Sequence, residues 1–232
     1  MNQQFDIGAI QRRTLRVLTA GQVVGSAALS AAVTVGAFVI QDILGQETPL
    51  GGMATATVTV GTAFMAQVLA RLMSVKGRRR GLALGYGLAL VGGLIAGLGV
   101  ETSSLWIFMI GLFLFGNGQA SNLLARYAAT DLAEPEHRGK AMSRVMFAST
   151  SGAVFGPILI KPAERIGEAL FGWSLYTGPW VFSGLFFTFA LVNVSIRLRP
   201  DPLEVAGRLG NPGQKECGRS ICQAVPEWTL IH

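Results

Sequence analysis

The chain has 232 residues, of which 50% are hydrophobic and only 14% are charged, and its formal net charge is +6. Soluble globular domains carry about 25% charged residues, so this composition argues against a water-soluble domain and indicates a membrane protein.

Six uncharged, mostly apolar stretches recur along the chain. They cover residues 17–41, 48–70, 81–100, 102–125, 145–160 and 169–196. A helix needs about 20 apolar residues to cross the hydrocarbon layer. The fifth stretch is shorter, but Arg144 and Lys161 flank it, and their long side chains reach the two interfaces. The sixth has a suitable length once its polar start is removed. We therefore predict an all-α membrane protein with six transmembrane helices.

The positions of the basic residues predict the orientation. If the six helices alternate in direction, seventeen Lys and Arg residues fall on the side of both termini, and only Lys161 and Arg165 fall on the other. By the positive-inside rule, both termini are expected to be cytoplasmic in a multi-pass protein of the inner (plasma) membrane. The positive charge then reflects topology, so the expected partner is the lipid bilayer and not nucleic acid.

The first stretch follows a polar segment, residues 1–16, which we interpret as a cytoplasmic tail. The stretch is too long for a signal peptide, so we expect it to remain as a membrane anchor. Within it, polar side chains recur every three or four residues and share one helix face. They are Thr19, Gln22, Ser26 and Ser30.

A densely basic connection of about ten residues joins the second and third stretches. Residues 70–80 read Ala-Arg-Leu-Met-Ser-Val-Lys-Gly-Arg-Arg-Arg, which resembles the cytoplasmic motif Gly-x-Leu-Ala-Asp-Arg-x-Gly-Arg-Lys/Arg of the major facilitator superfamily. The resemblance implies a cytoplasmic gating motif formed by Leu72, Ser74, Gly77, Arg78 and Arg79. Ser74 stands where the family has an acidic residue, which argues against the family's usual ion-pair switch at this position.

Two further stretches resemble the same family. The fourth ends Phe-Gly-Asn-Gly-Gln-Ala at 115–120, similar to a Gly-x-Gly segment of the family's fourth helix, and has Leu112 where a proton-coupling arginine is expected. The fifth contains Gly-Ala-Val-Phe-Gly-Pro at 152–157, similar to the core of the family's antiporter motif. We interpret five residues as positions of helix packing or bending. They are Gly116, Gly118, Gly152, Gly156 and Pro157.

The two remaining connections carry different residue types. The fourth-to-fifth connection includes Asp131, Arg138 and Gly139, and it resembles the family's central cytoplasmic loop. The fifth-to-sixth connection is aromatic, which suits the outer membrane interface. Its aromatic residues are Trp173, Tyr176 and Trp180.

The resemblance implies a substrate site, because the first and fourth helices line the central cavity in this family. The candidate cavity residues are Gln22, Ser26, Ser30, Asn117 and Ser121. A second interpretation stays open: hydroxyls bond their own helix backbone and amides join helices, each contributing about 0.6 kcal/mol.

The sequence divides into three parts: the tail 1–16, a transmembrane domain at 17–200, and a C-terminal segment at 201–232. The last segment contains both cysteines and no hydrophobic periodicity. It is either a disordered cytoplasmic tail or an aberrant extension of a truncated protein.

These features predict half of a twelve-helix transporter, built as two inverted three-helix units. We expect transport of a small solute by alternating access, together with a second six-helix half or a second copy. The resemblance implies that this transport is coupled to a gradient. Two alternatives remain: a truncated fragment or interaction module that does not transport, and a six-span transporter acting as a homodimer. No enzyme, metal or cofactor is predicted, since only two histidines and no phosphate-binding loop are present.

Overall fold

The structure is a computed structural model that describes residues 7–45, 49–131, 133, 135–172, 174, 176–199, 201 and 203. Every regular element in this part of the chain is helical, as predicted. The elements are α1 (Ile7–Leu44), η1 (Pro49–Gly51), α2 (Gly52–Lys76), α3 (Arg78–Glu101), α4 (Leu105–Ala128), η2 (Pro135–His137), α5 (Arg138–Ile158), α6 (Ile160–Phe171) and α7 (Thr177–Arg197). The predictions for the segments 1–6 and 204–232, including both cysteines, lie outside the described residues.

Five helices, α1, α2, α3, α4 and α7, are long and apolar enough to cross a membrane. Helices α5 and α6 meet the same criterion together, but the chain bends by 46° between them. With this pair counted as one broken span, the described helices supply the six predicted crossings. The last span begins at Thr177, because the polar residues at the start of the sixth stretch are not part of its helix.

The turn between α2 and α3 consists of Gly77 alone, where a connection of about ten residues was predicted. Gly77 has a φ of 91°, which glycine adopts without the steric penalty of a side chain. The basic residues on both sides of it are helical. The basic cluster therefore belongs to the end of α2 and the first turn of α3.

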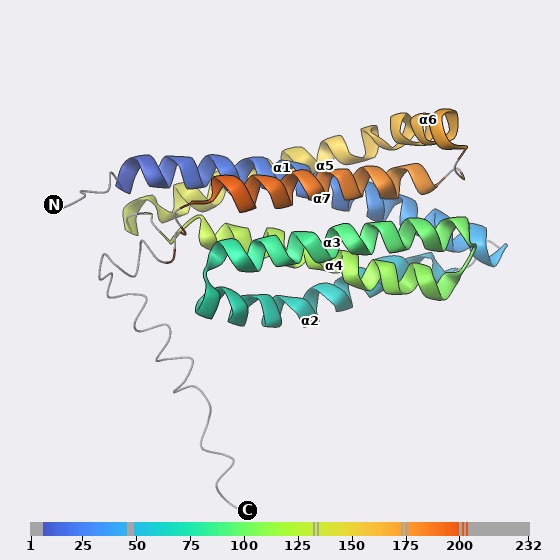
Figure 1. The fold of residues 1–232 in the computed structure, drawn as a ribbon, viewed down its shortest axis with the longest axis horizontal. Coiled ribbons are helices and arrows are strands. Elements are labelled where there is room, and N and C mark those ends of the chain that lie inside the picture. The colour runs from blue at the N-terminus through green and yellow to red at the C-terminus, as the bar shows by residue number, and fades with distance from the viewer. Residues whose placement is uncertain are drawn as a thin grey trace, which may run out of the picture.

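The helices form two layers in Figure 1, with α1, α5 and α7 in one and α2, α3 and α4 in the other. The most extensive contacts join α3 with α4, α1 with α5, α3 with α7, α2 with α4, and α1 with α7. Exchanging α1, α2 and α3 for α4, α5 and α7 leaves this pattern unchanged: α1–α5 becomes α4–α2, and α3–α4 becomes α7–α1. Because each unit crosses the membrane three times, the second unit begins on the opposite side from the first and is therefore inverted. The contacts thus agree with two inverted three-helix units.

An aromatic cluster fills the space between α3, α4 and α7. Trp180 is 0% exposed, and its ring meets those of Phe108 and Phe115 edge-on, with centroids 5.3 and 5.4 Å apart. The prediction that Trp180 lies at the outer interface is wrong, because α7 begins before it and turns it into the bundle. Trp173 lies outside the described residues.

Glycines of α5 allow it to approach α1 closely. A Cβ on Gly152 would overlap the carbonyl oxygen of Val23, and one on Gly156 would lie 2.5 Å from the carbonyl oxygen of Ala27. Side chains at these positions would push the two backbones apart. Both glycines therefore lie where the backbones of α5 and α1 approach closely, and small residues four positions apart allow such an approach.

The other predicted packing and bending positions also lie at contacts between elements. A Cβ on Gly116 would be 2.5 Å from the carbonyl oxygen of Val58 in α2, and one on Gly118 would overlap the ring of Phe187 in α7. Pro157 is next to the last residue of α5, directly before the bend into α6. A proline at this place removes a backbone donor, which favours a break in the helix.

Candidate functional site

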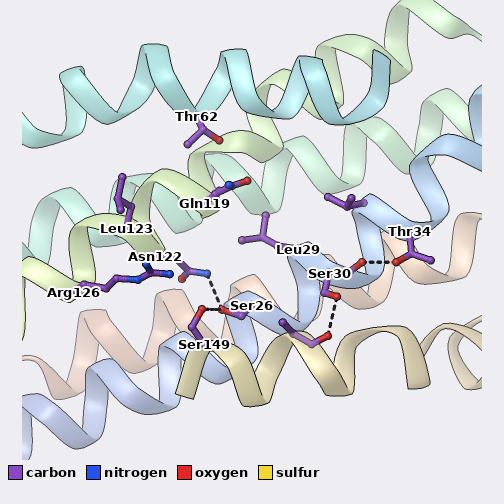
Figure 2. A pocket seen from close by; sticks show the side chains of 12 residues that line it. Ser26, Leu29, Ser30, Thr34, Thr62, Gln119, Asn122, Leu123, Arg126 and Ser149 are labelled. Carbon is purple, nitrogen blue, oxygen red and sulfur yellow. Dashed lines mark hydrogen bonds between the residues drawn. The ribbon is translucent and has the colours of Figure 1, made fainter. Parts of the chain in front are cut away.

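A cavity of about 470 Å³ opens between α1, α2, α4 and α5 (Figure 2). Hydroxyl and amide groups dominate its polar lining, together with one arginine, and no lining residue is acidic. The lining residues are Ser26, Leu29, Ser30, Val33, Thr34, Thr62, Gln119, Asn122, Leu123, Arg126, Ser149 and Ala153.

Hydrogen bonds hold the α1 side of this cavity against α5 and α4. The hydroxyls of Ser26 and Ser149 lie 2.8 Å apart and share a hydrogen bond, and Ser30 donates to the carbonyl oxygen of Ala153 at 2.8 Å. Asn122 donates to Ser26 at 3.5 Å and accepts a hydrogen bond from the Tyr86 hydroxyl at 2.9 Å. Ser26 and Ser30, two of the predicted site residues, are thus brought together at the cavity.

The other three predicted cavity residues do not line it. Gln22 is fully buried, and its amide has no partner among the described residues. Asn117 donates to the carbonyl oxygen of Leu114 in its own helix, and Ser121 packs against Gly85 of α3. Successive helical residues turn by about 100°, so a stripe of four-residue steps drifts around the helix. The drift separates Gln22 from Ser30, and contact of these three residues with a solute remains a prediction.

Helix α4 presents a different face to the cavity from the one predicted. The last three of its four lining residues follow the first by three, four and seven positions, which places all four on one helix face. They are Gln119, Asn122, Leu123 and Arg126. This spacing is visible in the sequence, but Arg126 is also one of the seventeen basic residues whose positions predict the orientation, and that role gives no reason to place it at a cavity.

Arg126 is the charged group of this cavity. Its side chain is half-buried, and the buried Nε atom has no hydrogen-bond partner among the described residues. Figure 2 shows the guanidinium beside Asn122, at one end of the row of polar side chains. No ion pair joins it to any described carboxylate.

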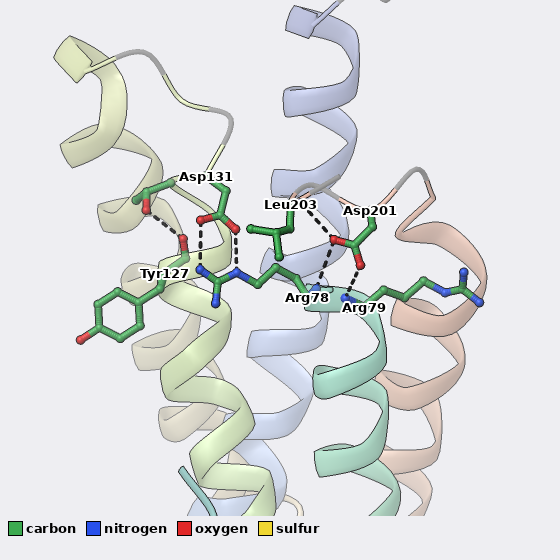
Figure 3. Close-up of polar contacts among 7 residues, drawn as sticks. Arg78, Arg79, Tyr127, Asp131, Asp201 and Leu203 are labelled. Atoms are coloured by element: carbon green, nitrogen blue, oxygen red, sulfur yellow. Dashed lines mark hydrogen bonds and ion pairs between the residues drawn. The ribbon is translucent and has the colours of Figure 1, made fainter. Parts of the chain in front are cut away.

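A second polar cluster lies at the end of the bundle that carries the α2–α3 turn (Figure 3). The guanidinium of Arg78 donates to both carboxylate oxygens of Asp131, at 2.8 and 3.2 Å. Burial raises the pKa of Asp131, although its hydrogen bonds with Arg78 act in the opposite direction. Arg78 of the predicted gating motif and Asp131 of the predicted loop are therefore joined.

Asp201, which follows α7, caps the first turn of α3. It accepts hydrogen bonds from the backbone N–H groups of Arg78 and Arg79, at 3.1 and 2.9 Å. A Cβ on Gly77 would overlap its carboxylate, so this glycine also leaves room for the cap. Asp201 was not among the predicted site residues, because no local pattern connects it with a turn that precedes it by more than a hundred positions.

Arg138, from the second predicted motif, lies close enough to this ion pair for its positive charge to act on Asp131 and lower its pKa, against the larger effect of burial. Ser74 is exposed, and its hydroxyl donates to the carbonyl oxygen of Arg71, while Leu72 is half-buried. Arg138 and Gly139 are the first two residues of α5 and not loop residues. The Nε atom of Arg138 donates to the carbonyl oxygen of Ala133 at 3.4 Å.

Replacing Asp201 with alanine is expected to destabilise the bundle by about 1 kcal/mol, because a helix start loses a side-chain acceptor for its free N–H groups. Asp201→Asn keeps one acceptor oxygen and should lose less. Thermal unfolding of the detergent-solubilised protein is the measurement, and the unfolding midpoint should fall from the wild type to Asp201→Asn and further to Asp201→Ala. Equal midpoints for all three proteins would show that the cap does not stabilise α3.

Within the described part of the chain, no three His, Cys, Asp or Glu side chains gather closely enough to hold a metal ion. The fold defines a multi-pass, all-helical membrane protein in which a polar cavity opens between the helices.

The comparisons with known proteins identify the family. The sequence profile of the Major Facilitator Superfamily matches residues 18–225, so the chain belongs to this family. Two Bacillus subtilis (strain 168) proteins, the uncharacterized MFS-type transporters YddS and YdeG, are each 37% identical to it, over 210 and 201 residues. These matches cover 89% and 85% of this chain, and 47% and 46% of the relatives.

A more distant relative is the riboflavin transporter RfnT of Brucella anthropi, which is 27% identical over 199 residues. That match covers 85% of this chain and 50% of RfnT. The chain thus spans about half the length of the curated relatives that it matches.

Proposed function

We propose that this chain forms one half of a secondary transporter that moves a small solute by alternating access. The observation that carries the proposal is the polar cavity, whose walls come from α1 and α4, the equivalent first helices of the two inverted units, and from α2 and α5. Lipid tails offer no partners for such polar groups, so the cavity suits a solute path better than a lipid contact.

The second half of the transporter, or a second copy of the chain, is proposed to cover the face on which this cavity opens. The main contacts arrange six helices in the order α5, α1, α7, α3, α4, α2, so α2 and α5 are the two end helices. Both carry large exposed apolar side chains, among them Phe64 and Phe147. In this fold the solute site lies between two such halves, and one half rocks against the other.

The basic end of the bundle is proposed to face the cytoplasm of the inner (plasma) membrane, which places both termini there. Gly77, Arg78 and Arg79, with Asp131 and Asp201, then form the cytoplasmic gate. Asp131 and Asp201, which lie outside the motif at 70–80, supply the negative charge that the family has at the position of Ser74. The proposal therefore keeps an ion-pair switch although Ser74 is not acidic.

Reconstitution of the purified protein into vesicles tests the proposal. The oligomeric state is measured first, and uptake of labelled small solutes is then followed under a proton or sodium gradient. We expect no gradient-driven uptake by a monomer, because a lone half has no partner to rock against. Co-expression with a complementary six-helix half should restore uptake.

Uptake by a demonstrated monomer would contradict the half-transporter proposal. Uptake by a stable homodimer would instead support the six-span alternative. Continued absence of uptake in the presence of a complementary half would favour a fragment or interaction module that does not transport.

A further inference from the structure

We propose that the solute carries an anionic group, a carboxylate or a phosphate, and that Arg126 binds it. The proposal deepens the transporter function above and rests on it. It begins from the one charged side chain among the residues that line the cavity.

Among the described residues, no carboxylate forms an ion pair with the guanidinium of Arg126. Among the described arginines, it alone has a buried side-chain nitrogen without a hydrogen-bond partner. Asp131, five residues further along the chain, already accepts hydrogen bonds from two guanidinium nitrogens of Arg78. Since buried charged groups are normally paired, an anion that enters the cavity would complete the site.

The position of Arg126 argues against a plain role at the membrane edge. An arginine near a helix end usually extends into water at the interface, as the exposed Arg71 does at the end of α2. Arg126 instead lines the cavity and lies on the α4 face that carries Gln119 and Asn122. Charged groups kept among membrane helices commonly mark solute or ion paths.

The neighbouring groups fit an organic anion better than a bare inorganic ion. A guanidinium forms paired hydrogen bonds with carboxylate or phosphate oxygens. Gln119 is exposed in the cavity, and the hydroxyls of Ser26 and Ser149 lie along its wall, so these groups can bind polar atoms on the rest of the solute. The volume of about 470 Å³ lies within the range of sites for small organic molecules.

The test follows the side-chain nitrogen signals of the full chain by NMR in phosphatidylcholine nanodiscs, with Arg126→Lys used to assign the Arg126 signal. Benzoate and phenyl phosphate are titrated to millimolar concentrations beside their neutral counterparts, benzamide and phenol. We expect a saturable shift of the Arg126 Nε signal with the two anions and none with the neutral compounds. The Arg71 signal, from an exposed arginine at the same end of the bundle, should not respond saturably.

The variants test the same binding through the side-chain amide signals of Gln119 and Asn122. Arg126→Gln is expected to weaken anion binding about ten- to a hundredfold, as for the loss of charge-assisted hydrogen bonds. Arg126→Lys keeps the charge and should restore part of the affinity. Arg71→Gln should bind like the wild type.

Each contrary outcome is distinct. No saturable shift with either anion, or equal shifts with the neutral compounds, would overturn the proposal. In nanodiscs that contain phosphatidylglycerol, a shift of Arg126 by the lipid that also blocks benzoate would assign the site to a lipid headgroup and overturn the solute proposal. Because binding needs neither a second half nor a gradient, anion binding without transport would contradict only the transporter function.

Discussion

Replacing Gly152 with leucine is expected to separate α5 from α1 and to destabilise the folded bundle by about 3 kcal/mol. Even a methyl group at this position would overlap the carbonyl oxygen of Val23, and a backbone atom cannot rotate away as a side chain does. Gly152→Ala should also destabilise the bundle, but by less. Unfolding of the detergent-solubilised protein, followed by circular dichroism, measures both changes.

Gly139 provides the matched control, because it lies in the first turn of the same helix and a Cβ there would meet nothing within 4 Å. Gly139→Ala should stabilise α5 by up to about 1 kcal/mol, since alanine favours the helix more than glycine does. We therefore expect alanine to lower the stability of the bundle at position 152 and to raise it at position 139. Equal losses at both would show that the effect of Gly152 comes from helix propensity and not from contact with α1.

The features predicted well from the sequence are those that depend on local spacing. Six long apolar stretches identify the spans whatever their neighbours are, because the bilayer fixes the length of an apolar helix. The four-residue step between Gly152 and Gly156 likewise places both on one helix face. Neither pattern names the partner helix, and the contact with α1 came only from the structure.

Of the five candidate cavity residues, only Ser26 and Ser30 line the cavity that the structure contains. This difference has two physical reasons. A polar stripe drifts around a helix, so Gln22 points into the bundle while Ser26 and Ser30 reach the cavity. The second reason is that charge near a membrane edge has two explanations. Arg126 belongs to the seventeen basic residues that predict the orientation, and its side chain also lies among the cavity residues.

The partners of Arg78 illustrate a limit of a different kind. Asp131 and Asp201 belong to other helix ends, and a local motif cannot predict contacts that depend on how several helices are assembled. Ser74 stands where the family motif has an acidic residue, and its hydroxyl bonds only the backbone of its own helix, at Arg71. The carboxylates that meet the arginine come from outside the motif altogether.

Trp180→Ala is expected to destabilise the bundle by about 3 kcal/mol, the lower end of the range for truncating a buried tryptophan. The ring is 0% exposed and packs edge-on against Phe108 and Phe115, so its removal leaves a cavity at the junction of α3, α4 and α7. Lipid tails are as apolar as this core, and the loss therefore comes from missing packing contacts rather than from transfer to water.

Trp106 distinguishes this explanation from a general role of tryptophan at the membrane interface. It lies in the first turn of α4 and is 80% exposed, so Trp106→Ala removes an aromatic ring of the same size without opening the core. We expect its unfolding midpoint in detergent to stay close to that of the wild type, while the midpoint of Trp180→Ala falls. If both variants lost the same stability, an interfacial role for Trp180 would explain the result better than its burial, and the packing of α7 against α3 and α4 would need to be revised.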